Sequence, residues 1–341
     1  MKQQRIGIIG MRGMGDIRAK VAAKRDDCQV ACIAGRDEAF LQSKADEFGC
    51  PYVLDSQELI NSPEVDAVVV ATPNHLHYPF GLQAIEAGKH VFLEYPPAIS
   101  LEELDLLIEA RDAKGVTLGV GLSGRFEGPH LFLKRNLSKI GRPVLAHGSV
   151  ALEYIWKWSK CNDIMGDFFA LANFHHIDQS IDLFGAVEWV NATLTEEQDS
   201  EGNNVLLAGA TQMGFAGGVV GWSQYLMGVP ARQIWVTTIS GSAGSLVSES
   251  GKITWSHRDA NGCVTHEDIE PQLLEEKPAA MEADFGSFVE ATKNGKPCTL
   301  SCELARHSCE VAFASTRSAR IGQRVSVSAP LVEVQLHTEL L

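Results

Sequence analysis

The first third of the chain alternates short apolar runs with amphipathic runs of helical spacing. Alternation of this kind is typical of strand–helix–strand units on a parallel sheet. Asp37 and Ser100 stand where they can cap helices, and Gly49 and Gly115 stand where those helices would end. The predicted strands are residues 5–9, 29–34, 52–54, 65–71, 90–93 and 117–121. The pattern therefore predicts a doubly wound, Rossmann-type α/β domain over residues 1–122.

The pattern changes after about residue 125, where strands follow one another directly. Hairpin-type turns between consecutive strand-like segments favour antiparallel pairing. The predicted helices are residues 126–137, 168–184, 279–293 and 302–320. The predicted strands are residues 144–152, 188–194, 205–213, 218–226, 234–239, 244–248, 252–256 and 325–327. We predict that residues 123–341 form an α+β domain on one large, mostly antiparallel sheet.

The composition is that of a globular chain, and its charge excludes several classes of partner. The 341 residues are 45% hydrophobic, and 29 Lys and Arg stand against 43 Asp and Glu, a net charge of -14. This sign repels nucleic-acid phosphates and anionic lipid headgroups, so neither nucleic acid nor a membrane is expected as a partner. The uncharged stretch 202–231 is broken by glycines, Asn and Pro, which suits strands rather than a spanning helix.

Neither the N-terminus nor the cysteines indicate export or a metal. The first residues lead into a strand-like run without the apolar segment of a signal peptide, so we expect a cytoplasmic protein. The eight cysteines are scattered, without C-x-x-C or Cys/His spacing for zinc. We expect reduced thiols and no metal site.

A glycine-rich turn follows the first predicted strand and precedes a predicted helix over residues 16–24. In this context glycines let the chain turn sharply and bring backbone N–H groups against a pyrophosphate at the helix N-terminus. The spacing departs from G-x-G-x-x-G because Arg12 replaces the second glycine, and a turn that binds no ligand is the alternative. The candidate phosphate-binding residues are Gly10, Met11, Arg12, Gly13, Met14 and Gly15.

The end of the second predicted strand is expected to select the coenzyme. An Asp or Glu there holds the ribose hydroxyls of NAD. Here the position is Gly35, followed by Arg36 and Asp37. A guanidinium can hold a 2′-phosphate through two hydrogen bonds, so Arg36 favours NADP(H). NAD(H) is the alternative if Asp37 turns inward.

Two segments, 71–77 (ATPNHLH) and 87–96 (AGKHVFLEYP), resemble the ATPN-x-x-H and AGKHV-x-x-EKP motifs of the glucose-fructose oxidoreductase (Gfo/Idh/MocA) family. Further similar segments recur along nearly the whole chain. They are Arg125–Phe126, His175-x-x-Asp178, Leu183-x-Gly185, 241–246, Asp284–Phe285 and 318–322. The resemblance implies a Rossmann domain, a pyridine nucleotide, and a C-terminal sheet used for assembly into a homodimer or homotetramer.

The resemblance also implies roles for single residues. The positions that match the cofactor-lining residues of the family are Thr72, Pro73, Asn74, His77, Glu94 and Tyr95. The proline of the EKP motif typically follows a cis peptide bond, so the bond between Tyr95 and Pro96 is expected to be cis.

The catalytic residues of the family are only partly present. Members that oxidise sugar or inositol hydroxyls use the EKP lysine, an aspartate, and a histidine four residues further on. The matching residues here are Tyr95, Leu171 and His175. A phenol is a poor base at neutral pH but an acceptable acid, and leucine is neither. The departure favours reduction, in which the enzyme supplies a proton, over alcohol oxidation.

The Glu94-Tyr95-Pro96 variant is similar to the biliverdin reductase branch of the family, which has an arginine near the position of His176. On a helix, His175 and His176 point about 100° apart, so one of them is expected to face the nicotinamide. We expect His175, His176 or Tyr95 to donate a proton to a carbonyl, imine or tetrapyrrole-like conjugated substrate.

Two other functions are consistent with the sequence. One is a sugar or polyol dehydrogenase with a rearranged catalytic set, and the other is a catalytically silent homologue that binds nucleotide as a regulatory protein. The substrate is expected to be a small molecule. The candidate substrate contacts are Arg125, Tyr154, Trp156 and Trp158. The last three have period-two spacing after a strand, which would put their rings on one face, with a buried interface as the alternative.

Overall fold

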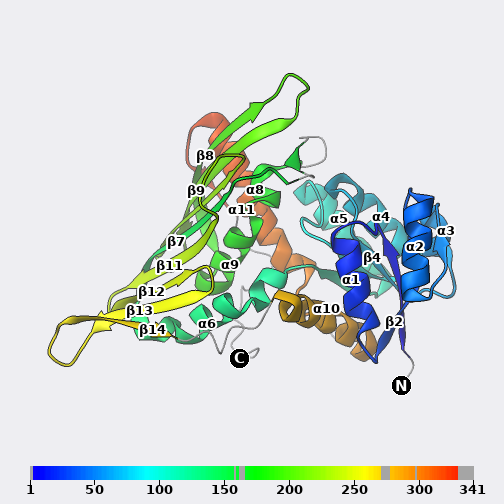
Figure 1. Cartoon of the computed structure of the whole chain (residues 1–341), viewed down its shortest axis with the longest axis horizontal. Coiled ribbons are helices and arrows are strands. Elements are labelled where there is room, and N and C mark those ends of the chain that lie inside the picture. The colour runs from blue at the N-terminus through cyan, green and yellow to red at the C-terminus, as the bar shows by residue number, and fades with distance from the viewer. Residues whose placement is uncertain (1–2, 157–158, 161–165, 270–276, 296–297, 329–341) are drawn as a thin grey trace. The chain divides into compact units, whose positions relative to one another are not determined.

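The chain forms two compact units, each with its own sheet, in a computed structural model that describes residues 3–156, 159–160, 166–269, 277–295 and 298–328 (Figure 1). The first unit is Met1–Ser123 together with Met281–Arg306. The second unit is Gly124–Ala280 together with His307–Leu341.

The first unit contains a six-stranded parallel sheet in the order β3-β2-β1-β4-β5-β6. Its strands are β1 (Gln4–Ile9), β2 (Cys28–Ala34), β3 (Tyr52–Val53), β4 (Ala67–Val70), β5 (His90–Leu93) and β6 (Leu118–Val120). Its connecting helices are α1 (Met14–Ala23), α2 (Glu38–Phe48), α3 (Ser56–Asn61), α4 (His77–Glu86) and α5 (Leu101–Lys114), with the short 3-10 helix η1 (Asn74–Leu76) before α4. This strand order is that of dinucleotide-binding domains, and it confirms the predicted α/β fold.

The predicted helix boundaries in the first unit follow from local capping chemistry. The Asp37 carboxylate accepts a hydrogen bond from the backbone N–H of Phe40 at the start of α2. The Ser100 hydroxyl accepts one from the N–H of Glu103 at the start of α5. Gly49 and Gly115 end these helices in the left-handed conformation that glycine adopts without strain. Each boundary depends on neighbours in sequence, which is why the sequence predicts it.

Helix α10 (Lys277–Asn294) differs from the prediction, which placed all of residues 123–341 in the second domain. Residues Met281–Arg306, which include most of α10, belong to the first unit. Phe285 and Phe288 are fully buried there, with ring centroids 5.5 and 5.3 Å from that of Phe92 in β5. Burial of these rings against β5 explains why the chain returns to the first unit, and nothing in the local pattern indicates it.

The second unit contains a nine-stranded sheet in the order β14-β13-β12-β11-β7-β10-β9-β8-β15. Its strands are β7 (Pro143–Leu152), β8 (Val187–Gln198), β9 (Asn204–Phe215), β10 (Val220–Met227), β11 (Ile234–Gly241), β12 (Gly244–Glu249), β13 (Lys252–Arg258), β14 (Val264–Ile269) and β15 (Val325–Ser326). The pairing is antiparallel except between β7 and β10. This confirms the predicted mostly antiparallel sheet. Strand β14 was not predicted, because its sequence VTHEDI is largely polar.

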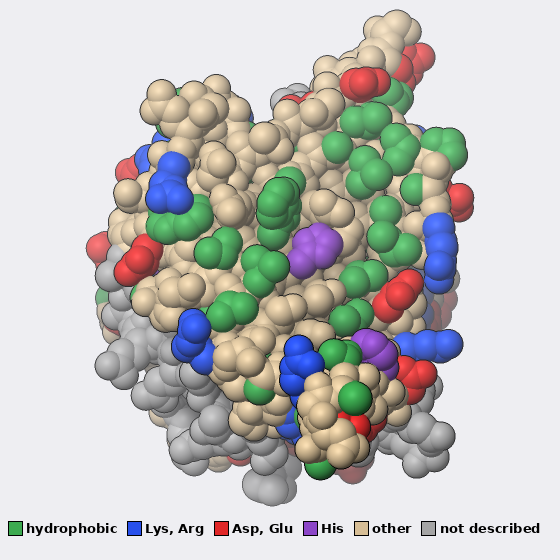
Figure 2. Space-filling view, turned by 90° about the vertical axis from the view of Figure 1, so that its left-hand side faces the viewer, with side chains coloured by type: hydrophobic (Ala, Val, Ile, Leu, Met, Phe, Trp, Pro, Cys, Tyr) green, Lys and Arg blue, Asp and Glu red, His purple; other side chains and the backbone are tan. Residues whose placement is uncertain are grey.

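Helices cover one face of the nine-stranded sheet, and the other face is open (Figures 1 and 2). The helices are α6 (Gly128–Asn136), α8 (Phe168–Leu171), α9 (Phe174–Phe184) and α11 (Cys302–Ile321), with the 3-10 helices η2 (Ser123–Phe126) and η3 (Leu137–Ile140). The single helix predicted over residues 168–184 is therefore two helices. On the open face, Leu145 of β7 and Trp222 of β10 are each 48% exposed.

Candidate functional site

The glycine-rich turn between β1 and α1 has the geometry of an anion cradle. A Cβ atom at Gly15 would lie 1.8 Å from the carbonyl oxygen of Gly10, and one at Gly10 would lie 2.6 Å from that of Ala71. Only glycine permits backbones to approach this closely. Among the described residues no side chain caps α1, whereas side chains cap α2, α3 and α5. The first N–H groups of α1 are thus left for an anion, so this turn fits a dinucleotide pyrophosphate.

Asp37 is committed to structural contacts beside this turn. Besides capping α2, its carboxylate pairs with the guanidinium of Arg12, which also lies over the ring of Phe40, 4.5 Å from the centroid. The N–H of Phe40, followed by Arg12, lowers the pKa of Asp37. Arg36 is exposed at the end of β2. The Asp37 carboxylate is therefore engaged, and Arg36 stays the predicted contact of a 2′-phosphate.

His77 connects the two segments that carry the family motifs. Its Nδ1 lies 2.7 Å from the carbonyl oxygen of Pro96, and its Nε2 lies 2.8 Å from that of Thr72. The ring is buried, which lowers the pKa of His77. The peptide bond between Tyr95 and Pro96 is cis, as predicted. Asn74 is also buried, and Tyr95 is half-buried directly after β5. His77 therefore joins the turn after β4 to the turn after β5 through one hydrogen bond to each.

The Glu94 carboxylate belongs to a buried ion cluster that sequence reasoning missed. Its Oε1 accepts a hydrogen bond from Nε of Arg18 at 2.6 Å, and the terminal nitrogens of Arg18 donate to Asp284 at 2.8 and 3.0 Å. The other Glu94 oxygen, Oε2, is buried and has no hydrogen-bond partner in the described part of the chain. Burial, reinforced by the charge of Glu94 and opposed by Arg18, raises the pKa of Asp284 to about 7. The only sequence signal was the Asp284–Phe285 motif, which does not reveal its partner.

In the second unit, the adjacent histidines at the start of α9 face different surroundings. A Cβ atom at Gly124 would lie 3.0 Å from Nδ1 of the half-buried His175. His176 instead packs on Gly148 of β7 and edge-on against Trp235 of β11, with ring centroids 5.4 Å apart. Both of its ring nitrogens are buried without a hydrogen-bond partner among the described residues. Burial, aided by the neighbouring histidines, lowers the pKa of His176 to about 3, so its imidazole is neutral.

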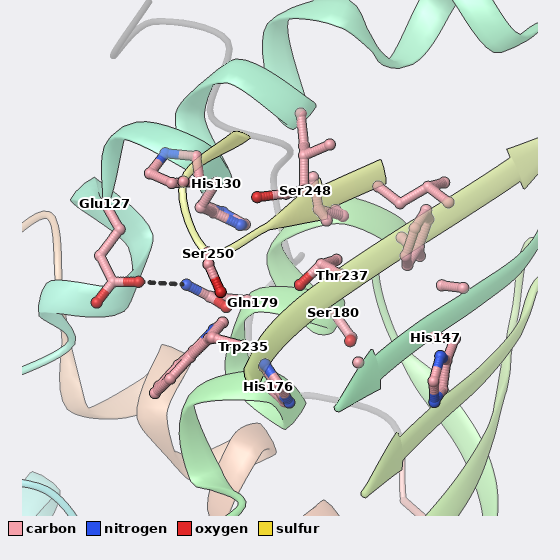
Figure 3. A pocket seen from close by; sticks show the side chains of 18 residues that line it. Glu127, His130, His147, His176, Gln179, Ser180, Trp235, Thr237, Ser248 and Ser250 are labelled. Carbon is pink, nitrogen blue, oxygen red and sulfur yellow. Dashed lines mark hydrogen bonds between the residues drawn. The ribbon is translucent and has the colours of Figure 1, made fainter. Parts of the chain in front are cut away.

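A cavity of about 330 Å³ lies beside His176 (Figure 3). It is lined by residues of α6, α9 and strands β7, β11 and β12, and we call it the α9 cavity. Most of its lining surface is apolar. Its lining includes Glu127, His130, His176, Gln179, Leu183, Phe184, Trp235 and Ile239. Trp235 and Gln179 were not predicted, and nothing in their local sequence distinguishes them from core residues.

The predicted substrate contact Arg125 is held in buried ion pairs. Its guanidinium donates to Asp178 at 2.7 and 2.9 Å and to Asp182 at 3.2 Å. Asp182 also accepts hydrogen bonds from His130 and Lys134. Burial alone would raise the pKa of Asp182, but His130, Arg125 and Lys134 together lower it well below its ordinary range. The donor groups of Arg125 are therefore engaged within the protein.

The aromatic cluster after β7 does not continue the strand. Strand β7 ends at Leu152, so the period-two argument for a shared face does not hold for the rings that follow. Tyr154 is 47% exposed, and the ring of Trp156 lies 5.7 Å from that of Tyr225 in β10. Trp158 lies outside the described residues. Neither Tyr154 nor Trp156 lines the α9 cavity.

Over the described ranges, no three His, Cys, Asp or Glu side chains are grouped so that they could hold a metal ion. In the same ranges no helix is long and apolar enough to cross a membrane.

Comparison with known proteins identifies both domains. Residues 4–122 match the family model "Oxidoreductase family, NAD-binding Rossmann fold", and residues 134–327 match "Oxidoreductase family, C-terminal alpha/beta domain". Both models belong to the Gfo/Idh/MocA family.

Solved structures and curated relatives agree with this assignment. Biliverdin reductase from Synechocystis sp. PCC 6803, in complex with biliverdin and NADP+, is 26% identical with a TM-score of 0.84, over 93% of this chain and 99% of that chain. Levoglucosan dehydrogenase, in complex with NADH and L-sorbose, has the same fold, with a TM-score of 0.84 at 22% identity over 96% of this chain and 100% of that chain. The scyllo-inositol 2-dehydrogenase (NADP(+)) of Bacillus subtilis (strain 168) is 29% identical over 58% of this chain and 56% of that protein. Alignments to three curated relatives cover from 34% to 56% of those proteins. The two family models together span most of the chain, which therefore belongs to the Gfo/Idh/MocA family of oxidoreductases, as its motifs predicted.

Proposed function

We propose that this protein is an NADP(H)-dependent reductase that acts on a carbonyl, imine or conjugated small molecule. The main support for this proposal is the identity of the residues at the family's catalytic positions. Tyr95 and the buried Leu171 stand where alcohol-oxidising members of the family have lysine and aspartate. A site without these groups has little means of removing a proton from an alcohol, but a phenol or imidazole can still supply one.

The first unit supports nucleotide binding through its own residues. The turn from Gly10 to Gly15 and the uncapped N-terminus of α1 suit the pyrophosphate, and Arg36 suits a 2′-phosphate. The bound coenzyme would supply a hydride from C4 of its nicotinamide. Biliverdin reductase, bound to NADP+, and the inositol dehydrogenase, named for NADP(+), support the same coenzyme choice.

Three side chains are proposed proton donors. Tyr95 follows β5 in the first unit, and His175 and His176 begin α9 in the second. We favour His175 and Tyr95, because both are half-buried and can exchange protons with solvent. The neutral, buried His176 is better suited to hydrogen bonding than to proton supply.

A sugar or polyol dehydrogenase is the second candidate. It is favoured by the curated inositol dehydrogenase relative, and by the levoglucosan dehydrogenase fold. A dehydrogenase would need another group to act as the base in place of the lysine that the family has at the position of Tyr95. A catalytically silent nucleotide-binding homologue is the third candidate.

The deciding experiment follows absorbance at 340 nm with each candidate substrate. The reductase proposal expects NADPH consumption with carbonyl, imine or bilin substrates, and at least tenfold lower kcat in Tyr95→Phe or His175→Ala. If both variants keep kcat within about twofold of the wild type, these catalytic roles are wrong. NADP+ reduction with a polyol panel would favour the dehydrogenase, and tight NADPH binding without turnover would favour the silent homologue.

We also propose that the open sheet face pairs with a second copy of the chain, giving a homodimer or homotetramer in the cytoplasm. The half-exposed Leu145 and Trp222 on this face are the supporting observation. Figure 2 shows hydrophobic side chains spread over this face. Sedimentation of the wild type and of Trp222→Glu tests the assembly, because a charge on this face should dissociate it.

A further inference from the structure

One polar side chain at the α9 cavity, that of His176, has no hydrogen-bond partner among the described residues. Two other polar groups at the cavity are already engaged. His130 bonds to Asp182 at 2.7 Å, and the Gln179 amide donates to the carbonyl oxygen of Gly124 at 2.8 Å. His176 is 5% exposed, and neither of its nitrogens has a partner among the residues described. More than about 90% of buried polar groups in proteins are paired, so an unpaired imidazole at a cavity wall points to a ligand that completes it.

The charge of the cavity favours an uncharged ligand. A neutral imidazole offers one donor and one acceptor, which a carbonyl or hydroxyl group can use. A neutral imidazole carries no positive charge that could offset the cost of burying an anion. Glu127 of the lining is a carboxylate that repels anions, and the nearby Asp182 is already paired with Arg125, His130 and Lys134. Among the described lining residues there is no Lys or Arg to pair with a phosphorylated or carboxylated ligand.

The size and lining of the cavity favour a ring system. A volume of about 330 Å³ is at the lower end of the range for small-molecule sites. The lining is mostly apolar, and it includes the indole of Trp235 together with Ile239, Leu183 and Phe184. Flat apolar rings gain more from contact with such a surface than polyols do, because each polyol hydroxyl would lose its hydrogen bonds to water.

We propose that the α9 cavity binds the apolar ring of an uncharged carbonyl substrate, and that His176 and Trp235 select it. This inference rests on the proposed reductase function and names its substrate class. Bound NADPH would supply the hydride for the carbonyl carbon, the carbon–oxygen π electrons would move to oxygen, and Tyr95 or His175 would supply the proton that the oxygen takes. The products would be an alcohol and NADP+. His176 is a specificity residue here, because it holds the substrate while another group supplies the proton.

The test uses 2-acetylnaphthalene, an uncharged bicyclic ketone, with the full chain. Isothermal titration calorimetry without nucleotide should show one site per chain, and His176→Leu should weaken it about three- to tenfold, as expected for one lost hydrogen bond. Trp235→Ala should weaken it further. The matched control is His266→Leu, which removes an exposed imidazole on β14 and should change nothing. His176→Leu keeps the volume and removes an unpaired polar group, so the fold should be preserved, and a circular dichroism melt checks this.

Two matched ligands test the substrate class. 2-Naphthoate has the same ring with a carboxylate in place of the ketone, and myo-inositol is an uncharged polyol. Both should bind at least tenfold more weakly than the ketone. Equal binding of either ligand, or ketone binding that His176→Leu and Trp235→Ala leave unchanged, would overturn the assignment of the cavity.

Turnover separates this inference from the function on which it rests. Ketone binding that depends on His176, without NADPH consumption on any carbonyl, would refute the reductase and leave the cavity assigned as a ligand site. NADPH consumption with unchanged KM for the ketone in His176→Leu would refute the cavity assignment and leave the reductase standing. The expected result is a raised KM for the ketone in His176→Leu, whereas Tyr95→Phe or His175→Ala lowers kcat.

Discussion

Arg18 and Asp284 form a buried, two-pronged ion pair between residues 266 positions apart in sequence, with nitrogen–oxygen distances of 2.8 and 3.0 Å. Both side chains are 0% exposed, and the same guanidinium also binds Glu94 at 2.6 Å. One cation therefore faces two carboxylates away from water. The cluster connects α1, which follows the glycine-rich turn, to the segment after β5 that contains Tyr95 and Pro96.

We expect Arg18→Met to destabilise the protein strongly, because it leaves two buried carboxylates without their cation. Removal of one partner from a buried ion pair typically lowers the free energy of unfolding by about 3–5 kcal/mol. Urea denaturation measures the change. Lys20→Met, which breaks the exposed pair between Lys20 and Asp16, is the control and should lower stability by less than about 1 kcal/mol. If the two variants lost a similar amount of unfolding free energy, the buried cluster would contribute no more to stability than an exposed ion pair.

Asp284→Asn should change how stability depends on pH. Burial raises the pKa of Asp284 from its ordinary 3.8 to about 7, so the folded chain binds this proton more tightly than the unfolded chain. This group therefore lowers stability as pH rises from about 4 to 7. The stability of Asp284→Asn relative to wild type should rise across that window, measured by denaturant unfolding at a series of pH values. Asp26→Asn, at an exposed position, should show no such trend.

His176→Leu should have a pH dependence of the opposite sign. Burial lowers the pKa of His176 from 6.5 to about 3, so the unfolded chain binds the proton more tightly and wild-type stability falls as pH drops from about 6.5 to 3. Compared with its effect at pH 8, the substitution should add about 2 kcal/mol to the free energy of unfolding at pH 5. An equal gain in the exposed variant His266→Leu would contradict burial as the cause.

Arg36→Ala should shift the coenzyme preference. Loss of charge-assisted hydrogen bonds to a 2′-phosphate should raise KM for NADPH by about ten- to a hundredfold, with little change in KM for NADH. Initial rates with each coenzyme at fixed substrate measure both constants. Arg135→Ala, at an exposed position on α6, is the matched control for loss of positive charge. A wild-type preference for NADH, or parallel changes with both coenzymes, would be evidence against Arg36.

The sequence alone was sufficient for features that depend on neighbouring residues. Asp37 and Ser100 cap helices through N–H groups three residues away, and the glycine turn after β1 is set by the lack of side chains within it. The alternation of apolar and polar positions likewise predicted both sheets, because strand and helix periods are local properties of the chain. The family motifs could be recognised from the sequence because each is a short run of neighbouring residues.

Only the tertiary structure decided which distant residues meet. Arg18 is brought together with Glu94 and Asp284, which lie 76 and 266 positions away in sequence, and Arg125 is brought together with Asp178 and Asp182. The α9 cavity exists because Trp235 of β11 and His176 of α9 are brought together. Long-range burial and charge pairing depend on positions in space, and no local periodicity encodes them.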